Sequence, residues 1–177
     1  MDENGAWTFV DTMKSPMGDA VDTAVVEKGS LLVRSRSAKQ GAMSVETTYK
    51  GAAVIGTMSV NGKDIPISAD LGGAAFAEAA GAPFVIGCLP LKEGYTASFR
   101  NFDLQKQKVK LLQLRVAGSE KVTVPAGIFD SYRVEVTNPD DSAEKVTYWI
   151  AKDARSVVKV AAVLPSMGGA TLSAELQ

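Results

Sequence analysis

The residue types that carry most enzymatic chemistry are scarce in this chain. It contains no histidine, the side chain that most often serves as a general base and as a neutral metal ligand. Two Ser-x-x-Lys spacings occur, Ser142 to Lys145 and Ser156 to Lys159, and such a pair can support acyl transfer. Both lie in or beside predicted strands, where side chains three residues apart point to opposite faces. We therefore interpret both spacings as coincidence.

The other candidate groups have structural explanations. Asp140 and Asp141, with Asn138 nearby, offer oxygens to a hard cation, but carboxylates at a hairpin tip usually form the turn itself. Cys88 is the only cysteine, and we expect it to be buried and unreactive because no histidine can activate it. The sequence also has no Walker loop and no dinucleotide glycine fingerprint. It predicts a protein that is not an enzyme and that uses no metal and no cofactor.

The elements that position these residues are predicted to be strands. Apolar and polar residues alternate through most of the chain, and turn residues interrupt the alternation about every ten positions. The clearest strand runs from Ser131 to Thr137, and Lys145 to Ile150 repeats its pattern after a turn, so the two form a hairpin. Asn61-Gly62 is the strongest short hairpin turn. Further strands are predicted near 7–13, 21–28, 31–38, 43–50, 53–60, 65–69, 95–103, 108–116, 122–124, 157–163 and 171–176.

One segment departs from this pattern. Gly72 to Gly81 is rich in alanine and bounded by glycine, which favours a short helix, and Pro83 to Pro90 is predicted to be a buried strand or a covering loop. Short turns between strands favour antiparallel pairing. We expect one mainly β domain, residues 1–177, with a curved antiparallel sheet of about 11 to 12 strands wrapped around the helix. The sheet would form a half-barrel or barrel; a sandwich is the alternative.

An aromatic set is the main candidate for binding. Such side chains line an apolar cavity beneath the helix or fill an ordinary core, and the sequence leaves both interpretations open. The candidate cavity residues are Phe76, Phe84, Tyr95, Phe99, Tyr132 and Tyr148, and Phe102 and Trp149 belong to the same set.

The net charge and the short apolar runs argue against nucleic-acid binding and against a transmembrane segment. The net charge is −1, so we expect no binding to nucleic acid, which depends on Lys and Arg neutralising phosphates. We expect no transmembrane segment, because apolar runs stay far shorter than the roughly 18 residues that a spanning helix needs.

The second half of the chain resembles a known family. The residues that carry the likeness are Leu89-Pro90-Leu91 with Gly94-Tyr95, then Val122 to Glu135, then Tyr148 to Ala151 leading into Val157-Val158-Lys159, and the most telling stretch is VPAGIFDSYRVE, Val124 to Glu135. The order of these pieces is similar to an uncharacterised family of exported bacterial β proteins. These domains of unknown function are related in fold to the lipoprotein carriers LolA and LolB. The shared stretch around Pro125 to Gly127 has a structural explanation, because it forms a turn before an alternating strand.

The resemblance implies a place and a task. It implies a domain in the periplasm or associated with the outer membrane, which would mean that a leader has been removed before Met1; a cytoplasmic chain is the alternative. The expected function is non-enzymatic binding of a lipid or other apolar molecule in the concave face of the sheet. The alternative is a structural module that binds another envelope protein, or an accessory domain of an exported hydrolase. An enzyme would need Asp, Glu, Lys or Tyr alone, for example a carboxylate pair such as Glu46 and Asp70.

Overall fold

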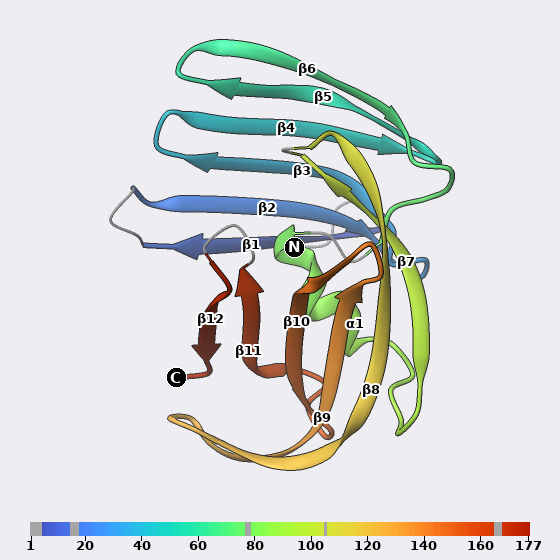
Figure 1. The fold of residues 1–177 in the computed structure, drawn as a ribbon, viewed down its shortest axis with the longest axis vertical. Coiled ribbons are helices and arrows are strands. Elements are labelled where there is room, and N and C mark those ends of the chain that lie inside the picture. Colours follow the sequence, from blue (N-terminus) through green and yellow to red (C-terminus); the bar gives the residue numbers. More distant parts are fainter. Residues whose placement is uncertain (1–4, 15–17, 77–78, 105, 165–167) are drawn as a thin grey trace. The chain divides into compact units, whose positions relative to one another are not determined.

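The computed structural model describes residues 5–14, 18–76, 79–104, 106–164 and 168–177, with only the backbone of residues 79, 142 and 164. Within these residues the chain forms twelve strands, one short 3-10 helix and one short α-helix (Figure 1). The strands are β1 (Ala6–Met13), β2 (Ala20–Glu27), β3 (Val33–Gln40), β4 (Met43–Lys50), β5 (Ala53–Val60), β6 (Lys63–Asp70), β7 (Thr96–Asp103), β8 (Lys108–Val124), β9 (Gly127–Asn138), β10 (Asp141–Ala151), β11 (Val157–Leu164) and β12 (Ala170–Glu175). The helices are η1 (Ala79–Gly81) and α1 (Ala82–Gly87).

The strands form two antiparallel sheets of six. Strands β1 to β6 pair in chain order, and strands β7 to β12 do the same. The hairpin predicted at Asn61-Gly62 is confirmed, because it joins β5 to β6. The φ angles of Asn61 and Gly62 are 51° and 77°, the positive values that a two-residue hairpin turn requires. The predicted mainly β, antiparallel fold with about twelve strands and a short helix is confirmed. The strands are shared between two sheets, and neither closes on itself within the described residues.

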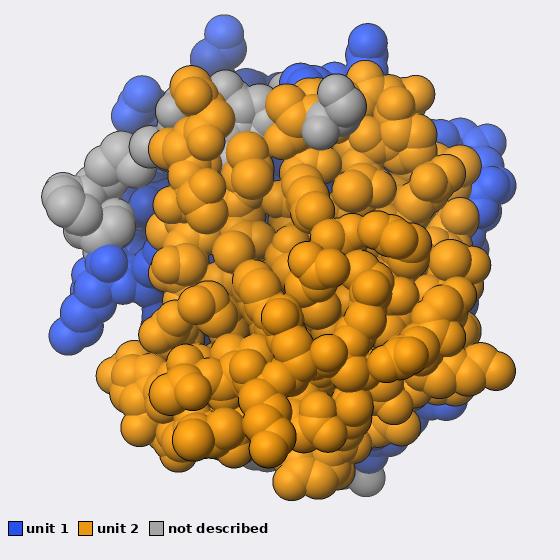
Figure 2. Space-filling model, turned by 60° about the horizontal axis from the view of Figure 1, so that its bottom comes forward, with its two compact units in different colours: residues 1–82, 100–110 blue, residues 83–99, 111–177 orange. Residues whose placement is uncertain are grey.

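The chain separates into two compact units, coloured differently in Figure 2. The N-terminal unit holds residues 1–82 and 100–110, and the C-terminal unit holds residues 83–99 and 111–177. Strands β7 and β8 each run from one unit into the other. The expectation of a single domain over residues 1–177 stays a prediction.

The predicted position of the helix is wrong. Of the segment Gly72 to Gly81, Gly72 and Gly73 have φ angles of 66° and 155°, which break a helix, and only its last residues form η1. Residues 77 and 78 lie outside the described part of the chain. The α-helix is instead α1, in the run predicted to be a strand or loop. Pro83 lies in its first turn, where a missing N–H costs no hydrogen bond, and Val85 and Ile86 are buried.

Strand β8 is longer than its pattern predicts. The sequence predicts separate strands at 108–116 and 122–124, whereas β8 is continuous over 17 residues. Its pairing with β9 shifts between Val116 and Gly118, so a bulge absorbs the break in alternation. The β8–β9 hairpin curls within the C-terminal unit until the backbone N–H of Ala126 donates to the Leu176 carbonyl at 3.2 Å (Figure 1).

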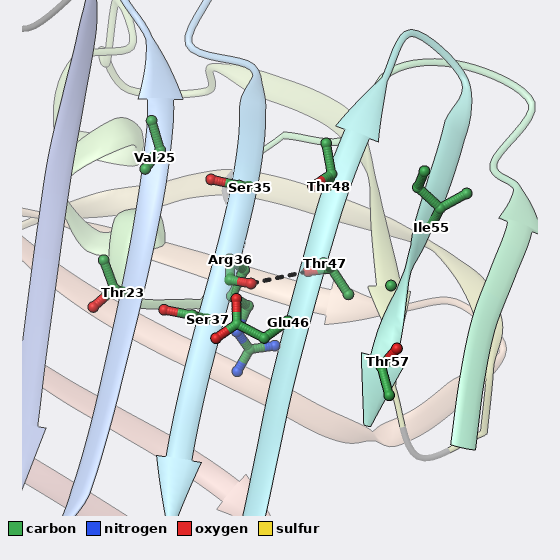
Figure 3. A pocket seen from close by; sticks show the side chains of 11 residues that line it. Thr23, Val25, Ser35, Arg36, Ser37, Glu46, Thr47, Thr48, Ile55 and Thr57 are labelled. Atoms are coloured by element: carbon green, nitrogen blue, oxygen red, sulfur yellow. Dashed lines mark hydrogen bonds between the residues drawn. The ribbon is translucent and has the colours of Figure 1, made fainter. Parts of the chain in front are cut away.

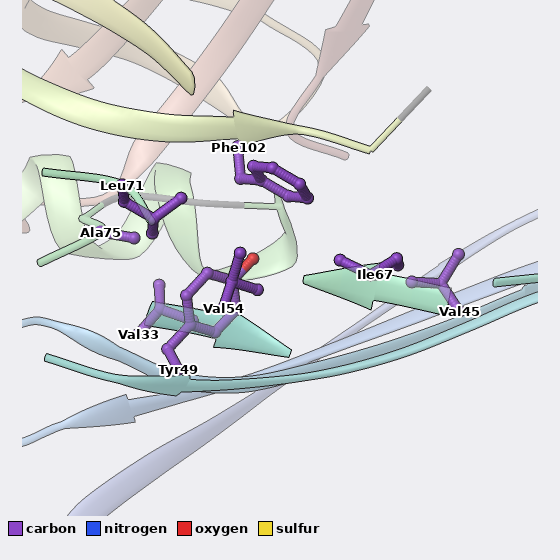
Figure 4. Packing of buried hydrophobic residues seen from close by; sticks show 8 residues of the cluster. All are labelled: Val33, Val45, Tyr49, Val54, Ile67, Leu71, Ala75 and Phe102. Carbon is purple, nitrogen blue, oxygen red and sulfur yellow. The ribbon is translucent and has the colours of Figure 1, made fainter. Parts of the chain in front are cut away.

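The N-terminal unit has its core on one face of the β1–β6 sheet. Alternate residues of neighbouring strands lie in register, so Val45 on β4 opposes Ala38 on β3 and Met58 on β5. Phe102 of β7 packs onto the buried cluster on this face (Figure 4). Its members are Val33, Val45, Tyr49, Val54, Ile67, Leu71, Ala75 and Phe102. We call this the core face of the sheet, and the other side the outer face.

Candidate functional site

The buried cluster covers only part of the core face of the N-terminal sheet. At one end of the strands this face carries exposed apolar side chains. Toward the hairpin ends of the strands, register places Met13 on β1 beside Ala20 on β2, and Met43 on β4 beside Val60 on β5. Met13 is 50% exposed and Met43 is 37% exposed. We call the apolar residues of this end the methionine patch. They are Met13, Ala20, Ala38, Met43, Met58, Val60 and Ile65.

Charged groups border the methionine patch. A hollow of about 230 Å³ lies among Met13, Ala20, Met43 and these groups. Its charged residues are Asp11, Asp22, Arg36 and Lys39. The Arg36 guanidinium donates to both carboxylate oxygens of Asp22, at 3.1 and 2.8 Å, which fixes the ion pair in a bidentate geometry. An apolar surface with a charged border suits an amphipathic molecule.

The outer face of the same sheet carries a polar hollow of about 390 Å³, which we call the Glu46 hollow (Figure 3). Figure 3 shows side chains from strands β2, β3, β4 and β5 around it. Besides Glu46, the hydroxyl-bearing residues that line it on this face are Thr23, Ser35, Ser37, Thr48 and Thr57. Hydroxyl groups both donate and accept hydrogen bonds, so the hollow offers partners to a polar group beside the apolar side chains of Val25 and Ile55.

Two close contacts shape the floor of the Glu46 hollow. A Cβ at Gly56 would lie 2.0 Å from the carbonyl oxygen of Glu46, so only glycine lets β5 approach β4 this closely. Beside it, the buried Thr47 hydroxyl donates to the Arg36 carbonyl at 3.3 Å. The floor therefore combines closely spaced backbone of β4 and β5 with the Thr47 side chain.

The structure does not bring Glu46 and Asp70 together as a carboxylate pair. Glu46 opposes Thr57 on β5, whereas Asp70 opposes Ala53 on the same strand. Four residues of strand correspond to about 13 Å, which is too far for two carboxylates to share one substrate bond.

The C-terminal unit carries a third hollow, of about 700 Å³, which we call the Glu135 hollow. Strands β7, β8 and β9 line it with Thr96, Ala97, Ser98, Gln113, Leu114, Arg115, Glu135 and Thr137. The side chain of Glu135 is only 11% exposed. Its carboxylate accepts hydrogen bonds from Arg115 and Lys145, each at 2.8 Å, and Arg133 lies 3.8 Å away.

These contacts set the charge state of Glu135. The hydrogen bond from Lys145 lowers the pKa of its carboxyl, burial opposes this, and Arg115 lowers the pKa further. A carboxyl with a lowered pKa stays ionised at neutral pH and is a poor proton donor. The arrangement thus favours charge recognition over acid–base chemistry.

The six predicted cavity residues do not share one described hollow. The five hollows described in the structure are lined by other residues. Phe76 belongs to the N-terminal unit, where its backbone N–H donates to the Arg100 carbonyl. Phe84 lies on α1 and is 55% exposed, whereas Phe99 on β7 is buried.

The three tyrosines of this set lie in the C-terminal unit in different surroundings. Tyr95 precedes β7, and its carbonyl accepts a hydrogen bond from Val116. The ring of Tyr132 lies beneath two cations, Lys152 Nζ at 5.2 Å and Arg155 at 5.8 Å from its centre. Burial raises the pKa of Tyr148 to about 12.

The remaining candidates from the sequence have clear positions. The expectation that Cys88 is buried is wrong: it is exposed, because α1 ends at Gly87 and places the next residue outside the helix. The interpretation of the Asp140 segment as a turn is confirmed, since the Asn138 side-chain oxygen accepts a hydrogen bond from the backbone N–H of Asp140.

Both lysines of the Ser-x-x-Lys spacings bind carboxylates. Lys145 binds Glu135, and Lys159 lies 2.7 Å from a carboxylate oxygen of Glu175. Each of these lysines is therefore paired with a carboxylate on a neighbouring strand.

Two features are absent from the described residues, a membrane-spanning helix and a metal-binding cluster. They contain no helix with the length and apolarity needed to cross a bilayer. They also contain no group of three or more His, Cys, Asp or Glu residues arranged to hold a metal ion.

Sequence reasoning missed the methionine patch and the Glu135 hollow. Glu135 closes the VPAGIFDSYRVE stretch, which the sequence explains as a turn and a strand. The available signal was the alternation of Arg133, Glu135 and Thr137 on one strand face, but their partners on β8 and β10 follow only from the strand register.

Comparison with known proteins gives one match. A family model described as "Protein of unknown function (DUF3108)" matches residues 4–175, nearly the whole chain. Neither a curated protein nor a solved structure shows significant similarity.

Proposed function

The chain belongs to the DUF3108 family of proteins of unknown function, and from this premise we propose that it is a non-enzymatic binding domain of the bacterial cell envelope. We propose that it takes a lipid or another apolar chain on the core face of its N-terminal sheet. A location in the periplasm or at the outer membrane, and a fold related to LolA, are parts of the same proposal. They rest on the resemblance described above.

The methionine patch is the observation that supports this proposal. Met13, Met43 and Met58 are flexible and polarisable, so they adapt to chains of different shape. Covering partly exposed apolar side chains contributes about 25 cal/mol for each Å² removed from water, which is sufficient to drive binding of an acyl chain. The Asp22–Arg36 pair beside the patch offers both charges to a polar head.

The proposal is tested first by native mass spectrometry of protein purified from a bacterial host, followed by organic extraction and lipid analysis. A lipid or fatty acid that co-purifies at near-stoichiometric level supports it. Protein that carries no lipid and takes up no added fluorescent fatty acid contradicts it.

A pair of variants locates the binding surface. Met43 and Ser44 are neighbours on β4 that point to opposite faces of the sheet. Met43→Asp places a charge in the methionine patch, and we expect fatty-acid affinity to fall about tenfold or more. Ser44→Asp places the same charge on the outer face, and we expect affinity within about twofold of the original chain. Equal losses in both variants would contradict binding on the core face.

A second candidate function is supported by one edge of the other sheet. Strand β12 lies at the edge of its sheet, every residue in it is exposed, and it contains neither Lys nor Pro, which commonly block edge pairing. Such a strand suits a protein-interaction module that adds a strand from an envelope protein. Cross-linking in intact cells with a Leu172→Lys variant tests it: loss of a cross-linked partner supports this function, and unchanged cross-linking opposes it.

A further inference from the structure

Basic side chains outnumber acidic ones around the Glu135 carboxylate, which lines the Glu135 hollow. Three basic side chains, Arg115, Arg133 and Lys145, lie within 4 Å of the single Glu135 carboxylate, at 2.8, 3.8 and 2.8 Å. Counting formal charges, three positive groups and one negative group leave an excess of two positive charges around this carboxylate, although only Arg115 and Glu135 of the four line the hollow itself. Because the chain as a whole carries a net charge of −1, this excess is local and does not reflect a basic protein.

The excess charge is accessible. The Arg115 side chain is 63% exposed, although its Nη2 atom donates to Glu135. A guanidinium has five N–H donors in a planar fork, and the bond to Glu135 uses only one of its terminal nitrogens. Glu135, which is largely buried, therefore orients Arg115 without consuming its capacity to bind an anion.

Neutral donors lie in the same hollow. Thr96 and Ser98 come from β7, Gln113 from β8 and Thr137 from β9. The register of β8 and β9 sets Gln113 opposite Thr137 and Arg115 opposite Glu135, so these side chains share one face of the sheet. Three hydroxyl groups, one amide and one guanidinium thus surround a volume of about 700 Å³.

We propose that the Glu135 hollow binds the phosphoryl group of an anionic ligand through Arg115 and the surrounding hydroxyl groups. A phosphoryl group carries up to two negative charges on tetrahedrally arranged oxygens. Arg115 and the neutral donors on three strands can contact these oxygens, and Arg133 and Lys145 beside Glu135 add positive charge near the hollow. This inference is independent of the apolar ligand proposed for the methionine patch, because it concerns residues of the C-terminal unit alone. The ligand is either a soluble phosphate compound or a phosphate-bearing lipid headgroup, and the test separates the two.

The first arm of the test titrates inorganic phosphate into ¹⁵N-labelled protein and follows amide chemical shifts, with sodium chloride at equal ionic strength as the reference. We expect saturable shifts at Arg115, Glu135 and Thr137 with phosphate and not with chloride. Arg115→Ala should weaken phosphate binding about tenfold or more, because a hydrogen bond to a charged group contributes about 1.5 to 3 kcal/mol.

Two further variants keep the result interpretable. Arg34, which pairs with Glu27 in the N-terminal unit at 2.7 Å, provides the matched control, and Arg34→Ala should leave phosphate affinity within about twofold. Thr137→Val removes one hydroxyl group of the hollow with little change of shape, and should weaken binding a few-fold even if Arg115→Ala proves unstable.

The second arm measures co-sedimentation with phosphatidylcholine vesicles that contain or lack phosphatidylglycerol. Binding to the phosphatidylglycerol vesicles alone, lost in Arg115→Ala, identifies a lipid headgroup as the source of the phosphoryl group. Phosphate-induced shifts without vesicle binding identify a soluble ligand. Absence of both signals, or equal weakening by Arg115→Ala and Arg34→Ala, overturns the proposal.

Discussion

Lys145 on β10 donates a hydrogen bond to the carboxylate of Glu135 on β9 across 2.8 Å, and this contact is the largest cause of the lowered pKa of that carboxyl. The two residues are ten positions apart in the chain and come from the hairpin that the sequence predicts most clearly. The ionised carboxylate of Glu135 therefore contributes to the stability of the fold.

The first prediction concerns stability in acid. A carboxyl whose pKa is lowered on folding contributes stability above its unfolded value of 4.5, and loses it as pH falls through the lower folded value. We expect Glu135→Gln to lower the free energy of unfolding by about 1 kcal/mol or less at pH 7, because its partners are partly exposed. The difference should shrink as pH falls below 4.5 and vanish below the folded pKa.

Urea unfolding of both chains between pH 3 and pH 8 measures this difference. Glu93→Gln, at an exposed position, is the matched control and should change stability at pH 7 by less than about 0.5 kcal/mol. A Glu135→Gln deficit that stays constant down to pH 3 would contradict the proposed role of the ionised carboxylate.

The second prediction concerns alkaline pH. Burial raises the pKa of Tyr148 from 10.0 to about 12, so the folded state holds its proton longer than the unfolded chain does. Stability is complete below pH 10 and declines as pH rises toward 12. We expect Tyr148→Phe to remove this decline. Absorbance at 295 nm checks it: the chain has four tyrosines, and the absorbance rise near pH 12 should lose the contribution of one tyrosine in the variant.

The sequence predicts the strands well because alternation is a local property. Ser131 to Thr137 lies within β9 and Lys145 to Ile150 within β10, since side chains on a half-buried strand must alternate wherever the strand is placed. The helix was predicted one segment too early. Alanine content favours a helix at 72–81, but two glycines with positive φ break it, and the α-helix begins instead at Ala82, with Pro83 in its first turn.

The candidate sites were harder to predict because they depend on register and on sheet order. Arg115 meets Glu135 only because the β8 bulge between Val116 and Gly118 shifts the pairing, and no local pattern reveals that shift. Met13 and Met43 are 30 residues apart in sequence, yet they lie in one row across four strands. Aromatic type alone did not distinguish the buried Phe99 from the exposed Phe84.

The third prediction concerns the floor of the Glu46 hollow. Gly56→Ala places a methyl group 2.0 Å from a backbone carbonyl oxygen of β4, which cannot move without breaking the strand pairing. We expect a loss of about 1 to 3 kcal/mol in the free energy of unfolding, measured by urea denaturation. Thr57→Ala, at the exposed next position of β5, is the control and should change stability by less than about 0.5 kcal/mol.

If Gly56→Ala and Thr57→Ala unfold at the same urea concentration, the close approach of β4 and β5 is not as described. Loss in Gly56→Ala alone supports glycine as the residue that permits this spacing.

The fourth prediction separates two phenylalanines of the aromatic set. Phe102 is 2% exposed within the N-terminal core, whereas Phe84 on α1 is 55% exposed. Phe102→Ala removes a ring from a packed cluster, and we expect it to lower the free energy of unfolding by about 3 to 5 kcal/mol. Phe84→Ala should cost less than about 1 kcal/mol, because its ring is already largely in water.

Thermal and urea unfolding measure the difference, and fatty-acid uptake gives each variant a second readout. Phe84 was predicted from sequence to line an apolar ligand cavity, whereas the methionine patch lies in the other unit. If ligand binds at the patch, Phe84→Ala should leave uptake within about twofold, because a ring outside the binding surface contributes no buried area. A stable Phe84→Ala protein that has lost uptake would instead place the ligand beside α1 and overturn the assignment to the patch.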